Sequence, residues 1–196
     1  MNDLFYLLKI RLLHIEPEIW RRVAVPSDIT LDRLHDIIQI VMGWTDSHLH
    51  EFTIGKKRYS EYPESKEDGL ACGRYRLGNL VKRRGRSFMY SYDFGDGWEH
   101  EVTLEENPFA LPEMMPEIFC LDGERACPPE NVGGVPGYYA FCRAKDDPTH
   151  EDYETLMDWF GGKYEPVSFD LDAVNDGLIK YMRWSRDRYQ DWPGNY

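Results

Sequence analysis

The chain has 196 residues, among them 13 Tyr, 9 Phe and 6 Trp, and a formal net charge of −12. A chain of this length buries roughly 70% of its unfolded surface, so a folded protein with a sizeable core is predicted. Residues 1–100 carry 15 basic and 15 acidic side chains, whereas residues 101–196 carry 8 and 20. The acidic second half argues against nonspecific binding of that half to nucleic acid or to an anionic membrane, whereas the neutral first half could present a local basic face.

The start of the chain and its cysteines indicate the compartment. The first nine residues lack a basic segment followed by a long apolar run, and the four cysteines are widely scattered. We therefore expect a cytoplasmic protein with free thiols and no membrane association.

The first part of the chain predicts a hairpin and a helix. Apolar residues alternate over residues 4–12 and 19–25, and Glu16-Pro17-Glu18 separates the two runs. Apolar residues then recur at helical spacing over residues 31–42, between a threonine N-cap and a glycine that ends the helix. His35 lies just off this apolar stripe, so we assign it no role beyond the flank of the helix.

The next segment returns to a period of two. Residues 48–54 alternate and lead through a turn into a short strand around Tyr59, which predicts a second hairpin. Residues 61–76 are polar and predict a loop, and residues 77–81 are expected to form one helical turn.

A third hairpin is predicted around Gly95-Asp96-Gly97. Aromatic and apolar residues alternate over residues 88–94 before these glycines and over residues 98–104 after them. A glycine-containing connection of three residues between two such strands has a direct steric reason.

The last third predicts mainly helices after a short strand over residues 118–121. Helical spacing follows in three places: residues 137–145, residues 149–160 with Thr149 and Asp152 as a capping box, and a final segment capped by Asp170. The element order predicts the α+β class, with a mostly antiparallel sheet, one early helix packed on it and helices in the C-terminal third. We expect a single domain over residues 1–196; the alternative includes a helical appendage over residues 126–196.

One candidate surface or pocket combines the third hairpin, the histidines before it and the Pro-Pro-Glu loop after it. Its residues are His48, His50, Asp93, Asp96, Trp98, His100 and Glu130. Turn geometry alone accounts for the carboxylates of the hairpin, so we expect binding rather than acid–base catalysis there.

Metal binding is an alternative use of these residues. On a strand, His48 and His50 would place both imidazoles on one face about 7 Å apart, a geometry that holds a metal if a carboxylate or thiolate joins. Cys120 and Cys127 complete this set of candidates, but six residues separate them across a turn-rich passage. Because a Cys-x-x-Cys pair would be stronger evidence, we expect hydrogen-bonded histidines, buried free thiols and no cofactor.

Two basic runs occur in the first half of the chain, Lys56-Lys57-Arg58 and Lys82-Arg83-Arg84-Gly85-Arg86. The second run lies beside Phe88 and Tyr90, which makes Lys82, Arg83, Arg84 and Arg86 the candidates for contact with nucleic acid. The ordinary alternative for such a run is a solvated loop.

Several segments together resemble the plasmid pRiA4b ORF-3-like family, also described as MM3350-like. They are residues 19–23, the helix end from Leu34 to Trp44, His48-Leu49-His50-Glu51-Phe52, residues 92–100, residues 126–134 and Phe169-Asp170. The resemblance implies a prokaryotic protein of plasmids or mobile elements, sometimes labelled a resolvase or fused to a DNA-binding domain. Relatives commonly continue Pro-Pro-Glu with Asp-Cys-Gly-Gly or Asp-Val-Gly-Gly, whereas this chain has Asn131 and Val132, which weakens the case for a cysteine-based metal site.

The sequence therefore predicts a binding or interaction module for a protein or a small molecule rather than an enzyme. Serine-recombinase chemistry needs a nucleophilic serine among arginines, and no serine here has that setting. The alternative is a metal-assisted hydrolase or nucleic-acid-processing accessory that uses His48, His50, His100 and Asp93 or Asp96.

Overall fold

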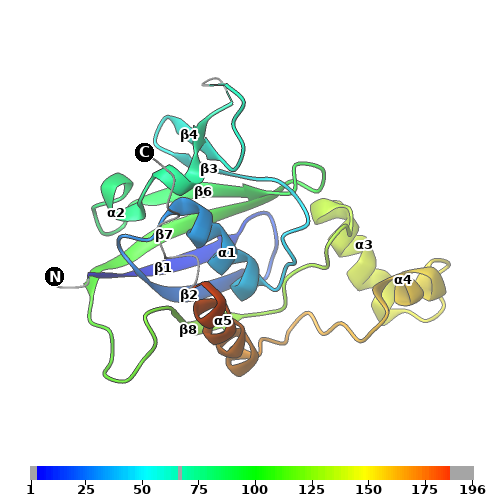
Figure 1. The fold of residues 1–196 in the computed structure, drawn as a ribbon. Coiled ribbons are helices and arrows are strands. Elements are labelled where there is room, and N and C mark those ends of the chain that lie inside the picture. Colours follow the sequence, from blue (N-terminus) through cyan, green and yellow to red (C-terminus); the bar gives the residue numbers. More distant parts are fainter. Residues whose placement is uncertain (1–3, 66–67, 186–196) are drawn as a thin grey trace.

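The computed structural model describes residues 4–65 and 68–185, which contain one large sheet and the helices packed against it (Figure 1). The elements are β1 (Phe5–Leu12), β2 (Ile19–Pro26), α1 (Leu31–Met42), β3 (His50–Ile54), β4 (Lys57–Ser60), β5 (Leu70–Ala71), the 3₁₀-helix η1 (Cys72–Arg74), α2 (Leu77–Leu80), β6 (Ser87–Tyr92), β7 (Trp98–Phe109), β8 (Phe119–Glu124), α3 (Gly134–Asp146), α4 (Tyr153–Phe160) and α5 (Leu171–Ser185).

The eight strands form a single sheet in the order β5-β4-β3-β6-β7-β1-β2-β8. The α+β class is as predicted, but the sheet is mixed, because β5 pairs with β4 in parallel while the other named pairs are antiparallel. The two residues of β5 lie in the polar stretch that the sequence predicts to be a loop, where no periodicity marks a strand. The expected mostly antiparallel sheet is thereby corrected to a mixed one.

The central strands bury one face and leave the other polar. On β1, Leu8, Ile10 and Leu12 are at most 1% exposed, as their shared phase predicts. The opposite phase includes Lys9 and Arg11, and Arg11 Nη2 donates to Glu101 Oε2 on β7 at 3.0 Å. Helices are therefore needed to cover only the apolar face of the sheet.

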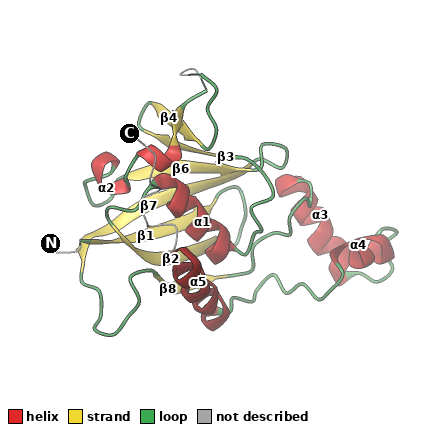
Figure 2. Ribbon diagram, in the orientation of Figure 1, coloured by secondary structure: helices red, strands yellow, loops and turns green. Residues whose placement is uncertain are grey.

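Helices α1 and α5 lie across the apolar face of the sheet (Figure 2). The apolar stripe of α1 is buried as predicted, and the helix ends at Gly43, whose N–H donates to Gln39 O at 2.8 Å from a φ of 95°. Helix α5 begins after Asp170, which accepts the Ala173 N–H at 2.9 Å and so acts as the predicted cap.

None of the described helices is long and apolar enough to cross a membrane.

Helices α3 and α4 lie to one side of the sheet (Figure 1). Helix α3 begins at Gly134, three residues before the expected start. Helix α4 begins only at Tyr153. The predicted capping box is wrong, because the Thr149 hydroxyl donates to Asp147 Oδ1 at 2.6 Å and closes a turn ahead of α4. A local side-chain hydrogen bond has thus replaced the helical one.

A buried arginine ties β2 to its surroundings. Arg21 is 2% exposed, and its guanidinium donates to the carbonyls of Trp20, Val41, Glu124 and Arg125 at 2.7–2.9 Å. The ring of Phe169 lies over the same guanidinium, 4.2 Å from its carbon. Since backbone carbonyls and a ring face take the place of a carboxylate, Arg21 holds α1, β2 and the chain after β8 together.

Candidate functional site

The turn between β6 and β7 is longer than the sequence predicts. Tyr92 pairs with Trp98, so the connection runs from Asp93 to Gly97 and has five residues instead of three. Asp93 adopts a φ of 52°, and its Oδ1 accepts the N–H groups of Gly95 and Asp96 at 3.0 and 3.3 Å. Phe94 leaves the strand pattern and is 61% exposed. The carboxylate of Asp93 thus shapes the turn, as side-chain-to-backbone hydrogen bonds do in Asx turns.

A partly buried ring of hydrogen bonds surrounds His35, to which the sequence assigns no role. His35 Nδ1 lies 2.7 Å from Tyr90 Oη and Nε2 lies 2.8 Å from Asp46 Oδ1. Gln39 Nε2 donates to the same Tyr90 oxygen, and the Asp46 N–H donates to Gln39 Oε1, both at 3.0 Å. Because the carboxylate only accepts, His35 Nε2 carries a proton and the Tyr90 hydroxyl donates to Nδ1. The ring fixes α1 to β6.

Tyr90, His35 and Asp46 follow the order of nucleophile, base and orienting acid in a catalytic triad. A triad nucleophile must meet a substrate, yet Tyr90 is 0% exposed. Burial also raises the pKa of Tyr90 well above its ordinary value, which disfavours the phenolate. The ring is therefore structural.

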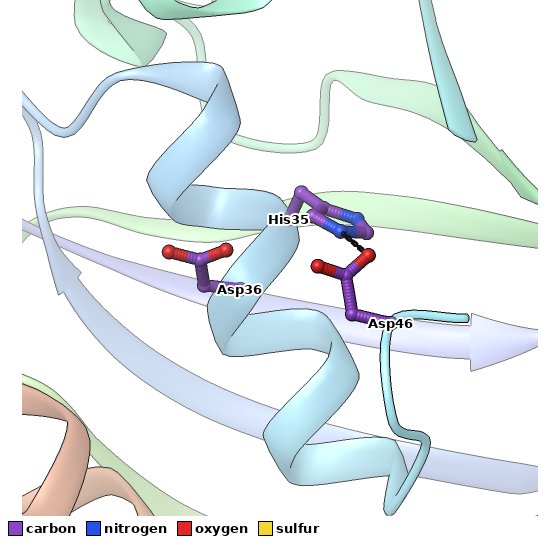
Figure 3. Close-up of side chains that lie close together, drawn as sticks. All are labelled: His35, Asp36 and Asp46. Atoms are coloured by element: carbon purple, nitrogen blue, oxygen red, sulfur yellow. Dashed lines mark hydrogen bonds and ion pairs between the residues drawn. The ribbon is translucent and has the colours of Figure 1, made fainter. Parts of the chain in front are cut away.

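His35, Asp36 and Asp46 are the one group of three potential metal ligands in the described residues whose donor atoms all lie within 4.8 Å of one another (Figure 3). Both nitrogens of His35 are engaged in the hydrogen-bond ring, and Asp36 Oδ2 accepts the hydroxyl of Tyr181 at 2.8 Å. An ion would have to break these bonds, so the group is better explained as helix packing.

His50 and His100 are buried in the core on opposite sides of Tyr90. The ring of His50 stacks on that of His35, with centroids 3.5 Å apart and planes 8° apart, and its Nε2 lies 3.9 Å from Cys72 Sγ. His100 is 0% exposed, and its Nδ1 lies 3.2 Å from the Tyr90 carbonyl oxygen. Burial lowers the pKa of each imidazole to about 3, so both are neutral at physiological pH.

Buried polar atoms without a hydrogen-bond partner gather around these residues. In the described chain they include His48 Nε2, His50 Nδ1, Trp98 Nε1, His100 Nε2 and Glu130 Oε2. Such atoms are rare in folded proteins because each costs desolvation free energy, and they mark places where water or a ligand binds. All five belong to residues of the predicted candidate surface.

Three segments meet beside the end of β6 and form a site that we call the junction. They are residues 44–49 after α1, the hairpin turn 93–97 and the Pro-Pro-Glu loop 127–134. Trp44 Nε1 donates to the Pro128 carbonyl at 3.0 Å, which holds the first segment to the third.

The hairpin turn is held to both neighbours by its acidic residues. The Asp93 N–H donates to Leu49 O at 3.0 Å, and the Gly133 N–H donates to Asp96 Oδ2 at 3.1 Å. Asp96 therefore joins the hairpin turn to the Pro-Pro-Glu loop.

Two carboxylates of the junction have one oxygen fixed by the protein and one left over. Glu130 Oε1 accepts from the Thr45 N–H at 2.9 Å, the Thr45 hydroxyl at 3.3 Å and the Tyr92 hydroxyl at 3.0 Å. Asp93 Oδ1 is occupied by the hairpin turn. The free oxygens, Glu130 Oε2 and Asp93 Oδ2, lie 3.9 and 3.5 Å from His48 Nε2.

His48 therefore lies between two oriented carboxylates. It precedes β3 instead of belonging to it, so the expected pairing of His48 and His50 on one strand is corrected. The three donor atoms are spread more widely than those of the His35 group, since they do not all lie within 4.8 Å of one another.

Each segment of the junction contains a residue other than glycine in the left-handed region. The φ values are 55° for Asp46, 52° for Asp93 and 58° for Asn131. Such conformations cost free energy and concentrate at ligand clamps and active sites. Asp and Asn adopt this conformation more readily than other residues with a side chain, so these three residues shape the loops of the junction.

Of the two cysteine candidates, Cys127 is the first residue of the Pro-Pro-Glu loop and Cys120 lies outside the junction. Cys120 is on β8, and its Sγ lies 3.3 Å from the Asp122 carbonyl. Burial raises the pKa of Cys120 to about 11 and that of Cys127 further, which disfavours the thiolates that a metal requires. Among the described residues, neither belongs to a group with metal-ligand spacing.

Sequence reasoning missed His35, Thr45 and Tyr92 as parts of this region. His35 lies four residues after Leu31 and three before Ile38, so helical spacing alone could have placed it on the buried face. No local sequence pattern marks Thr45 as part of the site, because its hydrogen-bond partner Glu130 is 85 residues away along the chain.

The fold and the site define an α+β protein with a helix-covered mixed sheet and an acidic, histidine-containing junction at one end of its central hairpin. The chain belongs to the family described as plasmid pRiA4b ORF-3-like protein, whose model matches residues 5–173. The resemblance in the sequence is thereby confirmed.

Two relatives agree with this membership. Uncharacterized protein y4hQ of Sinorhizobium fredii is 40% identical over 186 residues, which cover 91% of this chain and 95% of that protein. The crystal structure of MM3350, a protein of unknown function from Methanosarcina mazei Go1, superposes with a TM-score of 0.78 at 33% identity and covers 87% of this chain and 97% of that one.

Proposed function

We propose that this protein is a binding module and that the junction binds a divalent metal ion through His48, Asp93 and Glu130. The observation that carries the proposal is the convergence of one imidazole nitrogen and two carboxylate oxygens, of which His48 Nε2 and Glu130 Oε2 are buried without hydrogen-bond partners. An imidazole with two carboxylates is a donor set suited to Zn²⁺ and Mn²⁺.

The surroundings of the ligands support this choice. In metal sites the outer oxygen of a ligating carboxylate is usually hydrogen-bonded, which orients the inner one. Glu130 Oε1 and Asp93 Oδ1 are held in this way by Thr45, Tyr92 and the hairpin turn. We expect an ion to draw the two carboxylates closer together and to tighten the junction.

Binding is favoured over hydrolysis. The hydrolase alternative needs His50 and His100 beside the metal, but these rings are 1% and 0% exposed and face Tyr90. A substrate has no path to them without opening the core.

Titration calorimetry with Zn²⁺ and with Mn²⁺ tests the proposal on the intact chain. We expect one site per chain for the preferred ion. Loss of second-shell partners already weakens metal sites 10–100-fold, so His48→Gln and Glu130→Gln should each weaken binding by roughly 100-fold or more. Circular dichroism spectra like that of the unmodified protein would show that both variants fold.

His14→Gln is the matched control, because His14 Nε2 also contacts a carboxylate, that of Glu99 at 2.9 Å, on an exposed part of the surface. This variant should bind as the unmodified protein does. Absence of stoichiometric binding of either ion, or binding that survives both junction substitutions, would refute the metal site.

A further inference from the structure

The two basic runs of the sequence lie at the same end of the sheet. In the antiparallel pair of β3 and β6, Thr53 faces Met89, so the turn that follows Ile54 lies beside the start of β6 at Ser87. That turn contains Lys56, and Lys57 begins β4 directly after it. The loop before Ser87 contains Lys82, Arg83, Arg84 and Arg86. We call these six side chains the basic edge.

The basic edge is solvent-exposed and unpaired. All six residues are exposed, and within residues 4–65 and 68–185 none of them forms an ion pair. Arg58 is not included, because it pairs with Glu51. In a chain of net charge −12, six unpaired cations on one edge form a local field of opposite sign.

Few acidic side chains oppose this field. Glu105 and Glu106 line the surface next to Arg84, and Glu105 is already paired with Arg22. The more distant acidic residues are screened at physiological salt, where the Debye length is about 8 Å.

We propose that the basic edge binds the phosphate backbone of duplex nucleic acid. Lysine and arginine on a loop and an adjacent turn can each contact a phosphate without reading a base. Phe88 and Tyr90, the aromatic residues beside the loop, are 3% and 0% exposed, so they offer no stacking platform for unpaired bases. The surface therefore fits a duplex rather than a single strand.

This proposal is independent of the metal site. The basic edge lies at the Ser87 end of β6 and the junction at the Tyr92 end, a separation of roughly 17 Å along the strand.

Fluorescence anisotropy with labelled duplexes of unrelated sequence, at 50 and 200 mM NaCl, tests it on the full chain. For four phosphate contacts the affinity should fall on the order of 100-fold between the two salt concentrations, and it should be similar for every sequence. Arg84→Glu should weaken binding to all duplexes and reduce the salt slope by about 1.

Lys163→Glu is the matched control, since it makes the same change of charge at an exposed residue with no ion pair in the described chain. It should leave binding unchanged. No salt-sensitive binding, an equal loss in both variants, a clear preference for single strands, or binding only to phosphatidylserine vesicles would each overturn the proposal.

Discussion

At the scale of single residues, the three buried histidines differ in how many of their ring nitrogens have a hydrogen-bond partner. His35 has a partner for both ring nitrogens, whereas His50 and His100 each leave one nitrogen unpaired in the core. A neutral imidazole tolerates this better than an imidazolium, because burial of a charge costs far more than burial of a dipole. His50 and His100 should therefore stay neutral in the folded protein.

His100 should make the stability of the protein depend on pH. Burial lowers the pKa of His100 in the folded state to about 3, while in the unfolded chain it is about 6.5. Below pH 6.5 the unfolded chain binds a proton that the folded protein excludes, so the free energy of unfolding falls as the pH falls, by about 2 kcal/mol at pH 5. In the variant His100→Leu, this contribution to the decrease in the free energy of unfolding should disappear.

Urea denaturation at pH 7.5 and pH 5 measures the difference. The loss between the two pH values should be about 2 kcal/mol smaller in His100→Leu than in the unmodified protein, whatever the variant costs at pH 7.5. His150→Leu, which changes a histidine in the loop before α4, should leave the difference as it is. Equal losses in all three proteins would mean that His100 is protonated in the fold.

At the scale of elements, the junction depends on close approach of two loops. Gly134 adopts a φ of 65° at the start of α3, and a Cβ there would lie 2.4 Å from the carbonyl oxygen of Asp96. This approach lets the Gly133 N–H reach Asp96. The sequence explains the two glycines of the Pro-Pro-Glu loop by a turn alone. In the structure they also allow the loop to pack closely against the hairpin turn.

Gly134→Ala should separate the loops. Gly161 has a similar φ of 70°, but a Cβ there would meet nothing within 4 Å, so Gly161→Ala isolates the backbone cost of about 1 kcal/mol. We expect Gly134→Ala to cost about 3 kcal/mol in urea denaturation and to weaken Zn²⁺ binding, because the backbone of the turn must move. Equal stabilities of the two variants would show that the loops do not depend on this contact.

The elements themselves differ in how far the sequence predicts them. Strand β1 and helix α1 follow from periodicity over eight and twelve residues, which averages over local exceptions. The five-residue turn and the late start of α4 do not follow from periodicity. Local hydrogen bonds accepted by the carboxylates of Asp93 and Asp147 decide them.

At the scale of the whole molecule, the question is whether the chain after residue 126 is an appendage. We propose that it belongs to one domain with the sheet. Phe141 of α3 is 1% exposed, and the Tyr139 hydroxyl accepts the Glu16 N–H at 2.9 Å across 123 residues. The hydrogen bond of Tyr139 joins α3 to the β1–β2 connection, whereas the ring of Phe141 packs on Phe160 of α4 and on Tyr164.

Phe141→Ala tests the proposal. Removal of a buried phenylalanine costs about 3–5 kcal/mol, and in a single domain this loss should shift the unfolding of the sheet as well. Near-ultraviolet circular dichroism, which reports on the buried Trp44 and Trp98, and far-ultraviolet circular dichroism should show one coincident transition at lower urea. An appendage would instead give an early helical transition and leave the signal of the buried tryptophans in place.

The sequence by itself determined the class of the protein, its main strands and helices, its family and the residues from which a site could be built. These properties depend on neighbours along the chain or on motifs within short segments. The structure alone decided that His48, Asp93 and Glu130 meet while His50 and His100 are buried around Tyr90, and that the two basic runs share an edge. Such meetings depend on strand pairing and loop packing between separate segments of the chain, which no local pattern encodes.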